Sequence, residues 1–125
     1  MFIGNVHAAD PERHERQFDH VLSVTGDEQP LTTHHHPLSD GADNDWRTFE
    51  AVADAAHLLY RRDGSTLVHC EAGISRSATL VALALAAEED WTFVDALHEV
   101  QNARLHAVPH PALHELGVVY LAARA

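Results

Sequence analysis

The sequence of 125 residues contains no lysine: its eight basic residues are all arginine, against 19 aspartates and glutamates. The formal net charge of −11 creates a negative field, which disfavours nucleic acids and anionic membranes as partners. Such acidity is typical of an ordinary acidic protein or of one adapted to high salt, where screening relieves the repulsion between like charges. The missing lysine favours the high-salt interpretation.

Long apolar runs and a secretory signal are also missing. The longest apolar stretch, near residues 80–87, is far too short to span a bilayer. The first residues lack a basic region followed by an apolar core, so we expect no signal peptide and a cytoplasmic protein. With 46 % apolar residues, a chain of this length can bury one core. We therefore expect a single domain over residues 1–125, acting as a monomer.

Cys70 is the only cysteine, so no intramolecular disulfide can form. A lone cysteine in such a chain is more often a buried small apolar residue than a nucleophile. Its role must therefore be judged from the residues around it.

The order of the expected elements indicates the fold class. Apolar runs predict strands over residues 1–4, 19–25, 31–36 and 65–69. Helical periodicity begins at Trp46, after an N-cap at Asp45, and three further helices are expected over 77–89, from Thr92 and from Pro111. Strands followed by a strand–loop–helix unit and more helices predict an α/β domain with a small sheet covered by helices.

The segment VHCEAGISRSATL, residues 68–80, joins a strand to a helix through a loop over residues 70–76. Backbone N–H groups at a helix N-terminus favour a bound anion. Gly73 lets the backbone turn where a side chain would block the ligand, and the planar guanidinium of Arg76 can bind two phosphate oxygens. The same groups stabilise a thiolate at Cys70, which predicts attack on phosphorus and a phosphocysteine intermediate.

These residues resemble the protein tyrosine phosphatase signature, and the run HCEAGISRSATL resembles its dual-specificity branch. The stretches FIGNVHAAD, FDHVLSVTG and VPHPALHEL extend the likeness over nearly the whole chain, although His110 stands where the family usually has asparagine. The resemblance implies a small, mainly parallel central sheet flanked by helices.

The resemblance also implies roles for individual residues. Cys70 is the nucleophile, Arg76 binds the phosphoryl oxygens, Ser77 helps the sulfur to leave, and His69 orients the loop. The substrate contacts are the loop residues Glu71, Ala72, Gly73, Ile74, Ser75 and Arg76. No metal or cofactor is implied, and the run of His34, His35 and His36 is a poor metal site because alternate strand residues face opposite ways.

Cleavage of a phosphate ester needs a general acid, which in the resembling family is an aspartate on an upstream loop. The loop over residues 37–45 offers Asp40, Asp43 and Asp45. Asp45 is better explained as a helix cap. Asp40 matches the family pattern best, and Asp43 is the alternative.

The reaction that follows is hydrolysis of phosphotyrosine in proteins or peptides, with phosphoserine and phosphothreonine as further candidates. Two alternatives stay open: a catalytically weak module that binds phosphorylated residues, and a phosphatase for a small non-protein phosphate ester. A sulfurtransferase or arsenate reductase is disfavoured by the Ser75-Arg76-Ser77 run. Highly anionic substrates are disfavoured because the loop over 71–75 carries no basic side chain.

Overall fold

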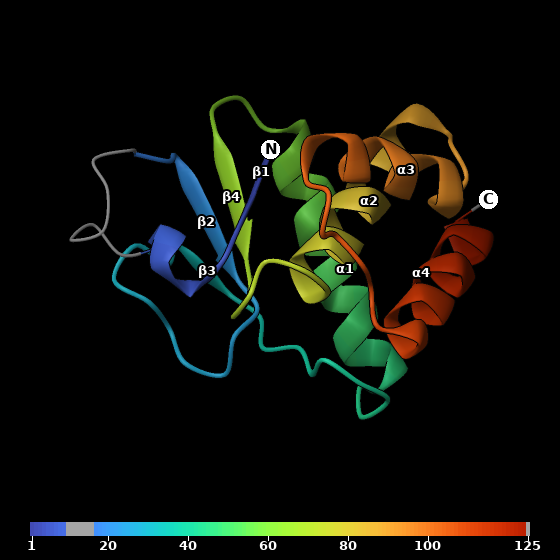
Figure 1. The fold of residues 1–125 in the computed structure, drawn as a ribbon, viewed down its shortest axis with the longest axis horizontal. Coiled ribbons are helices and arrows are strands. Elements are labelled where there is room, and N and C mark those ends of the chain that lie inside the picture. The colour runs from blue at the N-terminus through green and yellow to red at the C-terminus, as the bar shows by residue number, and fades with distance from the viewer. Residues whose placement is uncertain (10–16, 125) are drawn as a thin grey trace.

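The computed structural model describes residues 1–9 and 17–124, which form a small sheet packed against four helices (Figure 1). All strand pairs within the described residues are parallel. The sheet order is β1-β4-β2-β3, with bounds Phe2–Gly4, Thr66–His69, His20–Ser23 and His34–His35. The predicted α/β class with a mainly parallel sheet is confirmed.

The strand register positions the site. β4 lies between β1 and β2, and its last residue, His69, is paired with Gly4 on one side and Ser23 on the other. Because parallel strands end at the same edge of a sheet, these three residues share the edge from which the loop over 70–75 leaves. Ligands in open α/β sheets bind at this carboxyl edge.

The four helices lie on one face of the sheet (Figure 1). They are α1 (Trp46–Arg61), α2 (Arg76–Glu89), α3 (Phe93–Ala103) and α4 (Pro111–Arg124). A short 3-10 helix, η1 (Val6–Ala9), contacts β1 and β4. Ala9, Val21 and Leu67 form a small cluster of buried apolar residues there, separate from the main core. α2 packs against the other three helices and the sheet, so residues 77–84 are all buried, as its continuous apolar character predicted.

Two helix starts follow from local signals in the sequence. The carboxylate of Asp45 accepts the N–H of Thr48 at 2.8 Å, and the Thr92 hydroxyl accepts the N–H of Asp95 at 3.1 Å. Each bond satisfies a backbone donor that the first helical turn leaves unpaired. Both predicted N-caps are therefore confirmed.

The third strand is shorter than the expected span of 31–36, because it covers only His34–His35. A side chain takes part in the pairing just before it: the Thr33 hydroxyl accepts the N–H of Val21 at 2.7 Å and lies 3.1 Å from its carbonyl oxygen. Backbone contact with β2 nevertheless extends to both sides of the short strand, because the N–H of Thr33 donates to the carbonyl of Val21 at 3.0 Å and that of His36 donates to the carbonyl of Ser23 at 2.9 Å.

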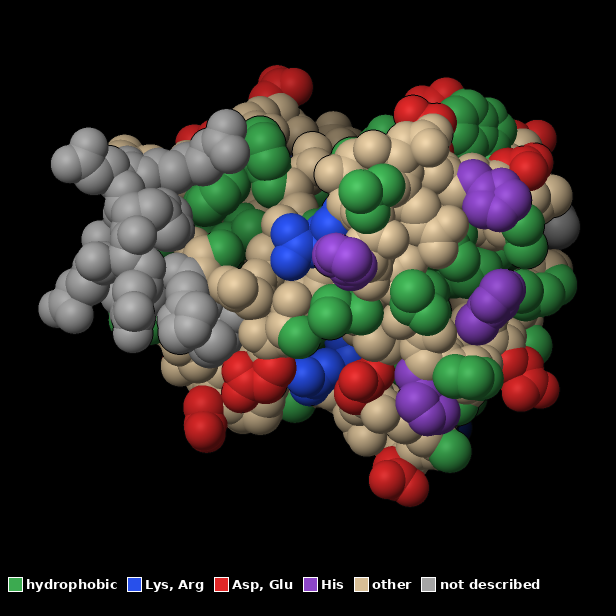
Figure 2. All heavy atoms as spheres, viewed as in Figure 1, with side chains coloured by type: hydrophobic (Ala, Val, Ile, Leu, Met, Phe, Trp, Pro, Cys, Tyr) green, Lys and Arg blue, Asp and Glu red, His purple; other side chains and the backbone are tan. Residues whose placement is uncertain are grey.

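The surface carries little positive charge on the face shown in Figure 2, where arginine side chains occupy small areas among scattered acidic and histidine side chains. No helix among the described residues is long and apolar enough to cross a membrane.

Candidate active site

Cys70 lies directly after the central strand β4, at the carboxyl edge of the sheet. Its backbone N–H donates to the carbonyl of Gly4 at 3.3 Å, so the neighbouring strand β1 fixes where the loop begins. We call residues 70–76 the phosphate loop. It runs from this buried strand end to the first residue of α2, as the sequence predicted, although the helix starts at Arg76 rather than Ser77.

Cys70 is 2 % exposed, and its sulfur is contacted by two hydrogen-bonding groups. The Ser77 hydroxyl lies 3.2 Å from Sγ, and the N–H of Gly73 donates to Sγ at 3.2 Å. Burial alone would raise the pKa of Cys70. Hydrogen bonds from Ser77 and Gly73 and the positive charge of Arg76 outweigh burial and lower the pKa below the usual range of a thiol. The site therefore favours a thiolate.

Gly73 is required at the closest approach of the loop to the sheet. Its φ is +69°, and a Cβ there would lie 2.9 Å from the carbonyl oxygen of Gly4. A side chain would meet both backbone strain and a steric clash. The glycine that the sequence singled out thus brings its own N–H close to the sulfur.

Arg104 holds the phosphate loop through hydrogen bonds to its backbone carbonyls. Sequence reasoning did not identify it as a site residue. It follows α3, and its Nε donates to the carbonyl of Gly73 at 2.6 Å, with a longer contact of 3.5 Å from Nη2 to the carbonyl of Ala72. These bonds fix the two carbonyls, and with that of Ala72 the peptide whose N–H, on Gly73, donates to the Cys70 sulfur.

Three other residues of the phosphate loop are exposed to solvent. Glu71, Ala72 and Ile74 are exposed, and the carbonyl of Ile74 accepts the N–H of Val108 at 2.9 Å. The contacts of these residues with a substrate phosphate stay a prediction, and we expect them to come from the backbone N–H groups.

Arg76 and Asp40 connect the phosphate loop to the loop over residues 37–45. Nη1 of the half-buried Arg76 donates to the carbonyl of Leu38 at 3.1 Å. The Asp40 carboxylate accepts the Ser75 hydroxyl at 2.5 Å, whereas Asp43 is exposed and has no hydrogen bond among the described residues. The geometry therefore brings Asp40, and not Asp43, to the phosphate loop.

His69 is fully buried at the end of β4. Its Nε2 lies 2.5 Å from the Ser23 hydroxyl, which in turn lies 2.6 Å from the Thr32 hydroxyl. Burial lowers the pKa of His69, although the Cys70 backbone and the charge of Glu71 act in the opposite direction. A neutral imidazole can hold the strand end in place but supplies no positive charge to the thiolate. Sequence reasoning missed this chain through Ser23 and Thr32.

Comparison with known proteins shows the family of this chain. Residues 1–118 match the family described as "Dual specificity phosphatase, catalytic domain". The chain belongs to the dual-specificity phosphatase family. The sequence-based recognition of this family is thereby confirmed.

Individual members of the family match over most of this chain. Dual specificity protein phosphatase 22 from Homo sapiens is 34 % identical over 117 residues, covering 88 % of this chain and 64 % of that protein. "MAP kinase phosphatase with leucine-rich repeats protein 3" from Dictyostelium discoideum is 29 % identical over 123 residues, covering 92 % of this chain and 14 % of that protein. The chain therefore spans less than two thirds of the length of either relative.

Several solved structures share the fold of this chain. The crystal structure of human DUSP28 has a TM-score of 0.81 at 23 % identity and covers 99 % of this chain and 94 % of that chain. The crystal structure of human tyrosine phosphatase-like serine/threonine/tyrosine-interacting protein has a TM-score of 0.79 at 20 % identity, covering 98 % and 91 %. At these identities the likeness concerns the fold.

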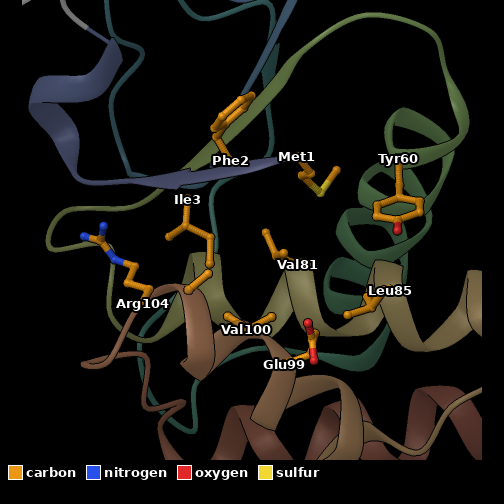
Figure 3. A pocket seen from close by; sticks show the side chains of 10 residues that line it. Met1, Phe2, Ile3, Tyr60, Val81, Leu85, Glu99, Val100 and Arg104 are labelled. Carbon is orange, nitrogen blue, oxygen red and sulfur yellow. The ribbon is translucent and has the colours of Figure 1, made fainter.

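A separate cavity of about 420 Å³ lies beside β1, between the sheet and the helices α1, α2 and α3 (Figure 3). Its lining is mainly apolar, with Tyr60, Glu99 and Arg104 as the polar members. Cys70 is not part of this lining. The cavity is linked to the phosphate loop through Arg104, which lines the cavity and also donates to the Gly73 carbonyl.

Proposed function

We propose that this chain hydrolyses phosphotyrosine, and also phosphoserine and phosphothreonine, in proteins or peptides through a phosphocysteine intermediate. The observation that carries this proposal is the environment of Cys70. A sulfur with a lowered pKa contacts a loop N–H and the Ser77 hydroxyl at the N-terminus of the central helix α2. Such a thiolate is poised to attack an electrophile bound in the phosphate loop.

In the first step, the Cys70 thiolate attacks phosphorus and the bond from phosphorus to the ester oxygen breaks. The loop N–H groups and the Arg76 guanidinium stabilise the charge on the transferring oxygens. Arg76 can keep its Nη1 bond to the Leu38 carbonyl, since its other N–H donors are sufficient for bidentate binding of the phosphoryl oxygens. Asp40 donates its proton to the departing oxygen, and the alcohol or phenol is released.

In the second step, water attacks the phosphocysteine and the S–P bond breaks. The Asp40 carboxylate accepts a proton from this water, which restores the acid. The Ser77 hydroxyl donates to the departing sulfur and stabilises the returning thiolate, which is consistent with its position 3.2 Å from Sγ. Inorganic phosphate is then released, and no external cofactor takes part in this sequence.

Peptide substrates are favoured over highly anionic ones by the side chains around the loop. Glu71 and Ile74 are exposed beside the site, and neither could pair with a second phosphate. With a net charge of −11, the surrounding field also opposes strongly anionic ligands. A neutral or basic peptide that carries one phosphate fits this environment best.

We further propose that residues 1–125 act as one catalytic domain, as a monomer in the cytoplasm, with phosphoproteins as partners and without nucleic acid or membrane. The acidic composition supports the exclusion of nucleic acids and anionic membranes. The single cysteine, which a reducing compartment keeps as a thiol, supports the location.

The test compares wild type with Cys70→Ser on a panel of phosphopeptides and a generic aryl phosphate. We expect the variant to lose turnover while it still binds inorganic phosphate or vanadate. Turnover on phosphopeptides by the wild type distinguishes a protein phosphatase from a module that only binds phosphorylated residues. A wild type that hydrolyses small esters but no phosphopeptide would support the small-molecule alternative instead.

A further inference from the structure

Ser75 has an unusual arrangement for a residue at its position. It precedes the first residue of α2, where a serine commonly accepts a backbone N–H of the helix with its hydroxyl. The Ser75 side chain makes no such cap bond. It is 8 % exposed, and its hydroxyl is used for two contacts outside the helix.

The two contacts orient the single hydroxyl proton. The backbone N–H of His110, in the connection between α3 and α4, donates to Ser75 Oγ at 2.8 Å. Ser75 Oγ donates in turn to Oδ1 of Asp40 at 2.5 Å. A hydroxyl has one proton to donate. With its oxygen accepting from His110, that proton is directed at the carboxylate.

The backbone of Ser75 is fixed as well. Its carbonyl accepts both the N–H of Thr79 at 3.0 Å and the hydroxyl of Thr79 at 2.8 Å. Asp40 itself is exposed, so its side chain depends on Ser75 for a defined position. Among the described residues, this fixed donor is the only hydrogen-bond partner of the Asp40 carboxylate.

We propose that Ser75 is a positioning residue for the general acid. This inference rests on the proposed function, in which Asp40 protonates the leaving group. The Ser75 hydroxyl donates to Oδ1 of Asp40, which leaves Oδ2 to carry the proton to the ester oxygen. His110 contributes through its backbone alone, by orienting the Ser75 hydroxyl.

If Ser75 positions the acid, the effect of replacing Ser75 on the rate should depend on the leaving group of the ester. An ester with a poor leaving group needs the proton during P–O cleavage, whereas an activated aryl phosphate needs it much less. Damage to the phosphate loop would slow both esters equally, because both use the same cradle. A misplaced general acid strongly slows only the ester with the poor leaving group, since small errors in the position of a catalytic group are costly.

The experiment measures kcat of Ser75→Ala, Asp40→Asn and the double variant on phenyl phosphate and on a nitro-substituted aryl phosphate. Asp43→Asn is the matched control, since it removes an exposed carboxylate from the same loop. We expect the loss in Ser75→Ala to be about tenfold larger on phenyl phosphate than on the activated ester, the upper end of the effect expected for one hydrogen bond to a protonated carboxyl group. Asp43→Asn should leave both rates close to wild type.

The double variant decides whether Ser75 acts through Asp40. In the Asp40→Asn background, Ser75→Ala should add no further leaving-group dependence. Equal losses of Ser75→Ala on both esters, or a full additional loss in the double variant, would overturn the inference while leaving Asp40 as the acid. An Asp40→Asn variant without leaving-group dependence would overturn both the acid assignment and the role of Ser75.

Discussion

The Nε of Arg104 donates to the carbonyl of Gly73 at 2.6 Å, while the N–H of the same glycine donates to the Cys70 sulfur at 3.2 Å. The peptide that links Ala72 to Gly73 also has its carbonyl 3.5 Å from Nη2 of Arg104. A cation on the carbonyl side strengthens the N–H of that peptide as a donor. Arg104 therefore acts on the thiolate through the backbone, without contact with it.

Replacing Arg104 should weaken catalysis more than stability. We expect Arg104→Gln to lower kcat/KM by about 10- to 100-fold, because the loop N–H groups lose their fixed direction. The cost in unfolding free energy should be about 1–2 kcal/mol, the contribution of a hydrogen bond to a charged group. Arg47→Gln, an exposed site with the same change in charge, is the control. If both variants reduced activity equally, overall charge and not loop geometry would be responsible.

The lowered pKa of Cys70 predicts how activity varies with pH. Only the thiolate attacks phosphorus, so kcat/KM should fall as pH drops through the pKa of Cys70 in the free enzyme. Ser77→Ala removes a hydrogen bond that lowers this pKa, so the fall should move to higher pH. The measurement is the acidic limb of the pH profile, with thiolate absorbance followed in parallel. A limb that stays in place would exclude Ser77 as a source of the shift.

Salt should stabilise the fold if the acidity is an adaptation to high salt. The net charge of −11 creates self-repulsion, which screening relieves. We expect the melting temperature to rise from low to molar sodium chloride. A melting temperature that is flat or falls over this range would reject the high-salt interpretation and leave an ordinary acidic protein.

Oxidation should inactivate the enzyme without forming an intramolecular disulfide, because Cys70 is the only cysteine. A thiolate is oxidised first to sulfenic acid, which can condense with a backbone nitrogen, such as that of Ser75, or with an external thiol. Prolonged peroxide should become irreversible, and bound phosphate should protect the sulfur. Mass spectrometry after graded peroxide gives the oxidation state of Cys70. Activity assayed before and after adding a thiol reductant shows whether inactivation is reversible. Complete recovery after long oxidation would contradict the prediction.

Local signals in the sequence account for the elements and the reactive loop. The caps at Asp45 and Thr92, the strand before Cys70 and the positive φ of Gly73 all depend on residues close together in the chain. Periodicity and capping report such short-range structure directly. The choice of Asp40 over Asp43 came from family resemblance, and only the contact with Ser75 gives it a structural reason.

Long-range partners explain what the sequence could not predict. Arg104 reaches Gly73 across 31 positions, and His69 reaches Ser23 across 46. No pattern in the sequence marks such pairs, because they form only after α3 packs on α2 and after β2 pairs with β4. Arg104, directly after α3, and the hydroxyl residues Ser23 and Thr32 do not differ in type from ordinary surface residues. Their roles follow from tertiary structure alone.

Capture of the covalent intermediate tests the phosphocysteine mechanism most directly. Ser77→Ala should slow the second step, since the departing sulfur loses its hydrogen-bond donor. The variant is mixed with an activated aryl phosphate and quenched in acid, and the modified residue is identified by mass spectrometry. We predict one phosphoryl group on Cys70, and none when Cys70 is replaced by serine in the same background. A phosphoryl group on another residue, or steady turnover without any phosphorylated Cys70, would contradict the mechanism.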